Sequence, residues 1–198
     1  MIELDVATLT PNQAARRRRV IEAAMKLAAE GGYDAVQMRD VASEAGVALG
    51  TIYRYFASKD HLLAACQVEW AEEIQRRVHQ RPPRGDTATD RVVDVLRRAT
   101  RSNEKQPQLT AALLTAISSP DPAVSDCQRQ MTAIMSDVLA IPMDGLDEDL
   151  KQGVIAALNH IWFSALLGWV NGWARADSVG ADLESAARLL LRDADAGA

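Results

Sequence analysis

EAGVALGTIYRYF, residues 44–56, concentrates two glycines, a threonine, an arginine and three aromatic residues in a chain whose aromatic content is only 5%. A helix-turn-helix needs a small residue on its first helix, a glycine with a positive φ at the turn, and a branched residue on its second helix. Ala42, Gly46 and Ile52 stand at that spacing, four and six residues apart. The stretch therefore predicts a helix-turn-helix whose interhelical angle depends on these three residues.

The second helix of this motif is predicted over residues 49–56, and its side chains divide into two sets. Ile52 and Phe56 point toward the core, whereas the others face solvent or a partner. Exposed tyrosines need a partner to cover them, unless they are core residues of a helical domain. In a DNA major groove, hydroxyl groups bond phosphates, apolar groups meet thymine methyls, and glycine lets the backbone approach. The candidate DNA contacts on this helix are Leu49, Gly50, Thr51, Tyr53, Arg54 and Tyr55.

The charge distribution separates the N-terminal quarter from the rest of the chain. The net charge of -5 disfavours a polyanionic partner, because phosphates must be neutralised by cations. Residues 12–59, however, hold eight Lys and Arg against five Asp and Glu, whereas residues 61–198 hold 14 against 19. Residues 16–19 are four arginines, and a solvated helix face is one interpretation of this run. Because four consecutive residues wrap the whole helix, the other interpretation is that two of them reach phosphates. Further candidate DNA contacts are Arg17, Arg18, Arg39 and Lys59, the last near a helix N-terminus.

Helical periodicity extends along almost the whole chain, without a convincing run of strand alternation. Thr10, Pro11 and Gln13 predict a capping box at the first helix, and Ser58 can cap the fourth. Prolines and glycines divide the remainder, most clearly over residues 81–86. About nine helices are expected, beginning at Pro11 and ending at Gly31–Gly32, then over about 38–45, 49–56, 59–80, 87–105, 107–118, 122–140, 147–176 and 179–194.

Composition indicates a cytoplasmic globular protein rather than a secreted, membrane or disordered one. The hydrophobic content is 48% and the charged content 25% over 198 residues, enough for one large domain or two small ones. Cys66 and Cys127 lie far apart without a CxxC pair, so we expect incidental thiols in a reducing compartment. Residues 152–174 carry no charge and are long enough to cross a membrane, but their Asn, His and Gly residues favour a buried helix.

Motifs of catalysis and metal binding are absent from the sequence. The three histidines are scattered, and no HExxH, GxSxG or P-loop pattern occurs. The acidic cluster over residues 144–149 lacks the spacing of a calcium loop and is typical of a solvated helix start. We therefore expect no enzyme activity, no metal and no cofactor.

The C-terminal part is predicted to hold a largely apolar chamber for a small molecule, although ordinary core packing is the alternative at each position. Asn159 and His160 interrupt an apolar helix, and burying them without partners costs about 1 to 3 kcal/mol each. They must therefore bond either a structural neighbour or the ligand. The candidate effector contacts are Trp70, Leu109, Leu113, Met131, Met135, Asn159, Trp162, Phe163 and Leu166.

Dimerisation is predicted from the last two helices, each of which has more apolar surface than one core can cover. Pairing both helices with their two-fold mates buries this surface and presents two DNA-reading helices. Successive major grooves on one face of DNA repeat at about 34 to 36 Å, so the spacing of these helices would control binding. The candidate interface residues are Leu158, Trp169, Trp173, Leu183, Ala187, Leu190 and Leu191.

GGYDAVQMRDVASEAGVALGTIYRYFASKDHLLAA, residues 31–65, resembles the DNA-binding signature of TetR-type bacterial transcriptional regulators. The resemblance implies an all-α homodimer with a helix-turn-helix DNA-binding domain over residues 1–57 and an effector-binding and dimerisation domain over residues 58–198. It also implies repression of a palindromic operator until a hydrophobic small molecule binds. Gln37 and Ala48 depart from the family, many of whose members carry Ser or Thr at these helix starts, so capping is weaker here.

A closer resemblance, to actinobacterial repressors of sterol catabolism, is dense up to about residue 65 and returns near residues 162–169 and 186–198. It implies a steroid or acyl-CoA thioester as effector. The alternatives are a transcriptional activator, a ligand-independent DNA-binding protein, and a small-molecule carrier or helical enzyme with a vestigial DNA-binding domain.

Overall fold

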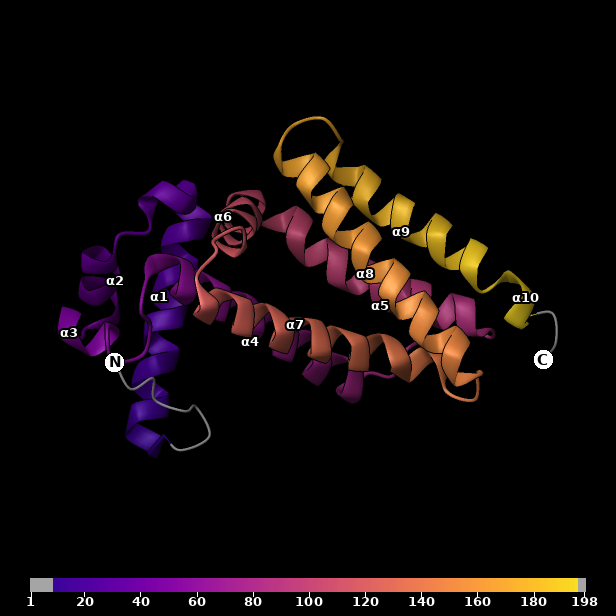
Figure 1. The fold of residues 1–198 in the computed structure, drawn as a ribbon, viewed down its shortest axis with the longest axis horizontal. Helices are drawn as coiled ribbons and strands as arrows, with labels where there is room; N and C mark the ends of the chain where they lie inside the picture. Colours follow the sequence, from indigo (N-terminus) through magenta and orange to yellow (C-terminus); the bar gives the residue numbers. More distant parts are fainter. Residues whose placement is uncertain (1–8, 196–198) are drawn as a thin grey trace. The chain divides into compact units, whose positions relative to one another are not determined.

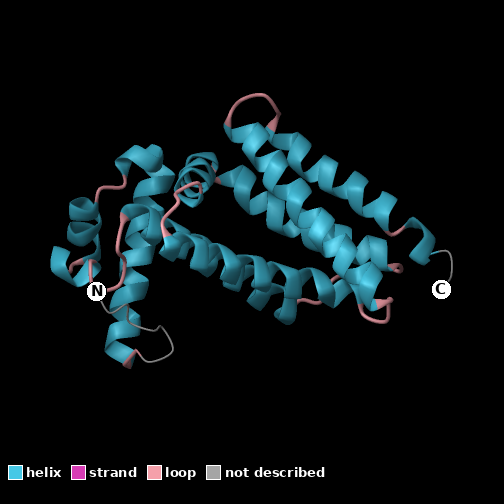
Figure 2. Cartoon of the chain, in the orientation of Figure 1, coloured by secondary structure: helices cyan, strands magenta, loops and turns pink. Residues whose placement is uncertain are grey.

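The computed structural model describes residues 9–195, and over these residues the chain is helical without any strand (Figures 1 and 2). The predicted all-α fold is confirmed. The elements in chain order are α1 (Pro11–Ala35), α2 (Met38–Ala45), α3 (Leu49–Ile52), α4 (Lys59–Gln80), α5 (Ala88–Lys105), α6 (Pro107–Ile117), α7 (Pro122–Ala140), the 3-10 helix η2 (Ile141–Met143), α8 (Glu148–Val170), α9 (Ala176–Leu190) and α10 (Arg192–Asp195).

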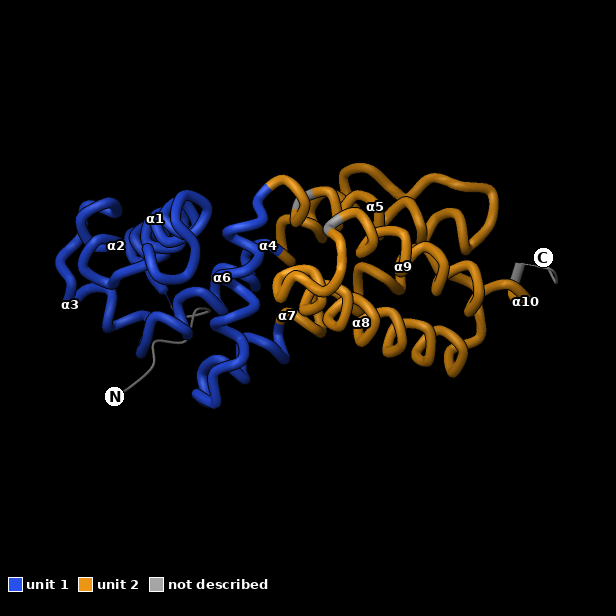
Figure 3. The backbone as a smooth tube through the Cα atoms, turned by 90° about the horizontal axis from the view of Figure 1, so that it is seen from above, with its two compact units in different colours: residues 1–70, 106–130 blue, residues 71–105, 131–198 orange. Residues whose placement is uncertain are grey.

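The chain forms two compact units, drawn in blue and orange in Figure 3. Unit 1 comprises residues 1–70 and 106–130, and unit 2 comprises residues 71–105 and 131–198. The border between the units falls within α4 and within α7, so each of these helices belongs to both. Unit 1 extends beyond the predicted domain of residues 1–57 because α6 packs against α1.

The first helix begins as its sequence predicts, but α1 continues to Ala35 beyond the end predicted at Gly31–Gly32. The Thr10 hydroxyl accepts a hydrogen bond from the Gln13 amide, and the Gln13 side chain accepts one from the Thr10 amide at 2.8 Å, which completes the capping box. Gly32, with φ 71° and ψ -162°, interrupts the helical backbone before the last turn. One face of α1 is fully buried against the rest of unit 1, through Val20, Ile21, Ala24 and Ala28.

The turn between α2 and α3 has the geometry that the helix-turn-helix interpretation requires. Gly46 has φ 62° and ψ 42°, the left-handed conformation that ends α2. The amide of Val47 donates to the Ala42 carbonyl at 3.0 Å, so the end of α2 is closed by a Schellman-type bond. Ala42 and Ile52 are buried on either side of the turn. This packing sets the direction in which α3 leaves the turn.

The predicted helix over 49–56 is shorter in the structure, where α3 ends at Ile52 and residues 53–55 form a turn. The amides of Tyr55 and Phe56 both donate to the Ile52 carbonyl, at 2.8 and 2.9 Å. Ala48 provides no side-chain cap at the start of α3. The turn allows Phe56 to enter the core, where its side chain is 1% exposed.

The two C-terminal predicted helices also differ from the structure. The helix predicted over 147–176 ends at Val170, and the one predicted over 179–194 is divided into α9 and α10. Asp147 caps α8 by accepting from the Leu150 amide at 3.0 Å, as expected for the acidic cluster. Within unit 2, α9 packs against both α5 and α8.

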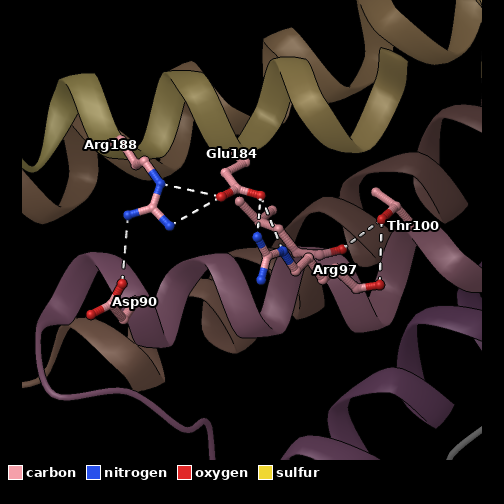
Figure 4. Close-up of polar contacts among 6 residues, drawn as sticks. Asp90, Arg97, Thr100, Glu184 and Arg188 are labelled. Atoms are coloured by element: carbon pink, nitrogen blue, oxygen red, sulfur yellow. Dashed lines mark hydrogen bonds and ion pairs between the residues drawn. The ribbon is translucent and has the colours of Figure 1, made fainter. Parts of the chain in front are cut away.

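A polar bridge joins α5 to α9 on the surface of unit 2 (Figure 4). The Glu184 carboxylate accepts from the Arg97 guanidinium at 2.6 and 3.0 Å and from the Arg188 guanidinium at 3.0 and 3.2 Å. Arg188 lies 3.5 Å from the Asp90 carboxylate on α5. Hydrogen bonds from Arg97 and then from Arg188 lower the pKa of Glu184 below its usual value.

Substitution of Gly46 tests the turn. Gly46→Ala is expected to destabilise the chain by about 1 kcal/mol, because a side chain at a left-handed φ is strained even where it clashes with nothing. A Cβ at Gly46 would meet no atom within 4 Å, so the loss would come from the backbone alone. Gly46→Asn should lose less, and Gly50→Ala, which also has open space but no positive φ, should lose nothing. Denaturant unfolding of the three variants measures this, and equal losses at Gly46 and Gly50 would contradict it.

Substitution of Glu184 tests the polar bridge through its pH dependence. Because the pKa of Glu184 is lower in the folded chain, its contribution to stability is present above the ordinary glutamate pKa of about 4.3 and is lost as the pH falls through the folded value. Glu184→Gln should therefore cost about 1 kcal/mol at neutral pH and progressively less in acid. Thermal unfolding at several pH values, with Asp182→Asn on the same helix as the control, should show this convergence. A deficit independent of pH would refute it.

Candidate functional site

Some of the predicted DNA-contact residues on α3 and the following turn are exposed to solvent. Tyr53 is 41% exposed, and Gly50 and Arg54 are exposed beside it. Thr51 is half-buried. Tyr53 and Arg54 lie on the turn rather than on a helix, so the exposed surface combines a short helix with the loop that follows.

Two members of the predicted set are held partly inside instead. Leu49 and Tyr55 are half-buried and pack against the core of unit 1. The Tyr55 ring lies 6.3 Å from the Phe56 ring, tilted by 58°. The expectation that both tyrosines face solvent therefore holds for Tyr53 only, because the shorter α3 turns Tyr55 toward the core.

The four arginines of α1 have different surroundings. The Arg17 guanidinium lies 5.4 Å from the centre of the Phe56 ring, a cation–π contact that leaves it half-buried. Arg18 is exposed, 4.0 Å from the Glu22 carboxylate. Arg19, which the sequence did not single out, donates through Nε to the Ala45 carbonyl at 3.3 Å and so ties α1 to the C-terminal end of α2. Only part of this run is available for phosphates.

Lys59 is held in place at the N-terminus of α4. Its ammonium group donates to the Tyr33 carbonyl at 3.2 Å and lies 3.6 Å from the centre of the Tyr33 ring. The Tyr33 hydroxyl in turn donates to the Asp60 carboxylate at 2.5 Å. This hydrogen bond, followed by burial, raises the pKa of Tyr33 to about 12. Sequence reasoning missed Tyr33, since no pattern of spacing connects residue 33 with residue 59.

Two of the predicted DNA contacts, Arg39 and Arg54, have guanidinium groups that are not paired with other described residues. Both side chains are exposed. Within residues 9–195 neither forms an ion pair or a side-chain hydrogen bond. A free guanidinium on a packed helical unit keeps all of its donors for a phosphate or a base.

The predicted effector contacts are divided between the two units. Leu109 and Leu113 on α6 are buried in the core of unit 1 with α1. Trp70 is half-buried at the end of the unit 1 part of α4. In unit 2, Met135, Trp162 and Leu166 are buried and Met131 is half-buried, whereas Phe163 is 47% exposed.

The two polar residues of α8 have different environments. Asn159 is half-buried, and its side-chain amide donates to the Ser136 hydroxyl at 3.4 Å. The sequence allowed either a structural neighbour or the effector as the partner of Asn159, and Ser136 is a structural neighbour of this kind. His160 is exposed in the single chain, so the expected cost of burying it does not arise there.

The predicted dimer contacts fall into a buried and an exposed group. Leu158, Leu183, Ala187 and Leu191 have no exposed surface in the single chain. They form the core of their own unit 2 and offer a partner nothing, which corrects the prediction for these four. Periodicity identified the apolar faces of α8 and α9 but not that the two helices pack against each other. Trp169 is half-buried, while Trp173 and Leu190 are exposed.

Apolar side chains nevertheless remain exposed in two places: Phe163, Leu167 and Trp173 on the C-terminal half of α8 and just after it, and Leu189 and Leu190 at the C-terminal end of α9. We call these five residues together the α8–α9 patch. Among the described residues α8 alone has the length and apolar composition of a membrane-spanning helix, with 33% of its most apolar window buried.

The cysteines and acidic groups provide no metal site among residues 9–195. Cys66 is fully buried, its thiol lies 3.8 Å from the Ile21 carbonyl, and burial raises its pKa. The thiol of Cys66 is therefore buried, while Cys127 is half-buried.

Comparison with known proteins agrees with this geometry. Residues 20–66 match the model of the tetR family of bacterial regulatory proteins, and residues 85–190 match that of the tetracyclin repressor-like C-terminal domain. The chain is 36% identical over 182 residues to the transcriptional repressor KstR of Rhodococcus jostii, covering 91% of this chain and 85% of KstR.

Solved structures show the same fold. A TetR transcriptional regulator from Rhodococcus sp. RHA1 superposes with a TM-score of 0.76 at 32% identity, covering 91% of this chain and 97% of that one. FadR of Thermus thermophilus, a TetR-family repressor in complex with lauroyl-CoA, has a TM-score of 0.68 at 20% identity, with 88% and 93% covered. With a matching N-terminal helix-turn-helix, a matching C-terminal domain and a relative aligned with 91% of this chain, the chain belongs to the TetR family of bacterial regulatory proteins.

Proposed function

We propose that this protein is a cytoplasmic homodimer that represses transcription by binding a palindromic operator and leaves the DNA when a hydrophobic effector binds. The observation that carries the proposal is the exposed segment of α3 and its turn, supported on a buried and well-packed helix-turn-helix. Family membership supplies the regulatory role, and KstR, a repressor, is similar over most of the chain.

The DNA contacts follow from which groups are exposed. Gly50 and Thr51 lie on α3, where a helix can enter the major groove and a small residue allows close approach. The Tyr53 hydroxyl and the guanidinium groups of Arg39 and Arg54 are available for phosphates. Leu49 keeps part of its side chain exposed, and a thymine methyl is the contact that suits it.

Lys59 contributes as a cation positioned in advance. A lysine normally loses much side-chain freedom when it binds a phosphate. Here the Tyr33 ring and carbonyl already restrain it next to the first amides of α4, which also attract anions. Less entropy is therefore lost when the DNA backbone arrives.

Dimerisation is assigned to the α8–α9 patch. Leu189 and Trp173 are each 69% exposed, and an apolar surface of this kind is typically covered in an assembly. A two-fold copy would bury the patch against itself and present two α3 segments to successive major grooves about 34 to 36 Å apart.

The effector is proposed to be a steroid or an acyl-CoA thioester. The lauroyl-CoA complex of FadR supports the thioester class, and the resemblance of the sequence to actinobacterial repressors of sterol catabolism supports the steroid class. Because α4 and α7 each belong to both units, a change in unit 2 has covalently continuous helices leading to unit 1. To release DNA, the ligand must bind the DNA-incompetent state more tightly than the competent one.

Loss of an unpaired cation tests the DNA contacts. Arg39→Ala should weaken operator binding about tenfold and reduce the salt dependence of binding by about one ion, because it removes one phosphate contact. Tyr53→Phe, which removes a single hydroxyl, should weaken binding several-fold without changing the fold. Mobility shift with the chain's own promoter region, at two salt concentrations, measures both. Arg129→Ala, which removes an exposed charge on α7, is the control, and identical shifts for all four proteins would sink the proposal.

Charge placed in the α8–α9 patch tests the dimer. Leu167→Arg should raise the dimer dissociation constant at least a hundredfold, about 2.8 kcal/mol, because a guanidinium would have to be buried against an apolar partner. Ala133→Arg, at an exposed position of α7, should leave the dimer intact. Sedimentation equilibrium distinguishes the two. A dimer that tolerates Leu167→Arg would exclude this patch as the interface.

A further inference from the structure

Unit 2 contains a groove of about 850 Å³ that gathers an unusual share of its positive charge. The groove is lined by the C-terminal half of α4, the loop after it and α5. Residues 61–198 hold 14 Lys and Arg against 19 Asp and Glu, yet six of those cations meet here with only Glu73 and Asp94 as anions. The six are Arg77, Arg81, Arg84, Arg98, Arg101 and Lys105.

The loop that carries two of these arginines is fixed by specific bonds. The Arg98 guanidinium donates to the Arg81 carbonyl at 2.7 Å and to the Pro82 carbonyl at 3.5 Å, and it pairs with Asp94. The same Asp94 carboxylate accepts from the Arg84 amide at 3.0 Å. Arg98 and Asp94 therefore serve as the frame of the groove, and the side chains of Arg81 and Arg84 are left to project from a restrained backbone.

Four cations of the groove have no counter-ion. Their side chains are exposed, and across the described part of the chain none of them takes part in an ion pair or a side-chain hydrogen bond. Like charges held together in one concave site repel each other and raise the local positive potential, which an anion with several charges would relieve. The four are Arg81, Arg84, Arg101 and Lys105.

The shape of the groove indicates what kind of anion fits. Its apolar lining residues, Ile74 and Val78, are almost fully buried at 4% and 2% exposure, so a ligand would meet mainly the charged side chains. A volume of this size is within the range of small-molecule sites, about 300 to 1,000 Å³. A DNA duplex offers a convex surface, which does not enter such a groove. A nucleotide with several phosphates is of a size to enter it and carries the several negative charges that the free cations attract.

We propose that this groove binds the phosphate groups of a coenzyme A thioester. The inference rests on the proposed function and deepens it: the nucleotide end of the effector is recognised by the cations of α4, α5 and the intervening loop. Arg81, Arg84 and Arg101 contact the phosphates, and Arg98 positions the loop. The thioester class of effector is then recognised in part by charge, independently of whether its acyl part is a steroid or a fatty chain.

Calorimetric titration of the full chain with lauroyl-CoA, free coenzyme A, 3′-dephospho-coenzyme A and inorganic pyrophosphate tests the groove. Arg81→Ala and Arg101→Ala should each weaken lauroyl-CoA and coenzyme A binding about tenfold, with Arg101→Lys recovering part of the loss. Dephosphorylated coenzyme A should bind the wild type more weakly than coenzyme A. Arg76→Ala, which removes a cation of α4 outside the groove, should bind both like the wild type.

Operator binding without ligand, measured on the same proteins, separates this inference from the proposed function. The groove variants should shift DNA like the wild type and should need more lauroyl-CoA to release it. Three results would each overturn the inference without affecting the proposed function. The first is unchanged thioester affinity in the variants, and the second is a wild type that binds DNA but neither coenzyme A nor lauroyl-CoA. The third is pyrophosphate binding as tightly as coenzyme A. Groove variants that lose DNA binding and retain coenzyme A would identify the groove as a DNA surface instead. A wild type that fails to bind its promoter would overturn the proposed function and leave the titration valid.

Discussion

The left-handed turn at Gly46 is the constraint on which the proposed DNA-reading surface depends. It ends α2, returns the Val47 amide to the Ala42 carbonyl and brings Ile52 against the small residues of α2. Because interiors are close-packed, a buried branched side chain leaves α3 one orientation. Tyr53 and Arg54 then project from a rigid support, and little order has to be gained when DNA is bound.

The two proposed anion sites are locally cationic although the protein as a whole is acidic. The net charge of -5 describes neither site, because cations gather in the helix-turn-helix and again in the groove of unit 2. In both places some of the cationic side chains donate hydrogen bonds to backbone carbonyls, while others form no ion pair or hydrogen bond within the described residues. Arg19 and Lys59 bond carbonyls in unit 1, as Arg98 does in unit 2. Arg39, Arg54, Arg81 and Arg101 keep their donors for a partner.

The helix ends were predicted well where local capping or turn residues determine them. They were predicted less well where tertiary packing determines them. The capping box at Thr10, the cap at Ser58 and the turn at Gly46 are all local, and each was found where expected. The end of α3 was missed because it depends on Phe56 reaching a core assembled from distant segments. Leu158 and Leu183 were assigned to a partner because periodicity identifies an apolar face without saying what covers it.

By itself the sequence determined the fold class and the position of the helix-turn-helix, since both depend on residue types at short, fixed spacings. Only the tertiary structure decided which of those side chains remain available. Tyr55 and Arg17 both contact the Phe56 ring. Lys59 donates to the carbonyl of Tyr33, which lies 26 residues earlier in the chain. The groove of unit 2 likewise joins α4 with α5 across a loop. Contacts between segments far apart in the chain arise from packing in three dimensions, which no local pattern encodes.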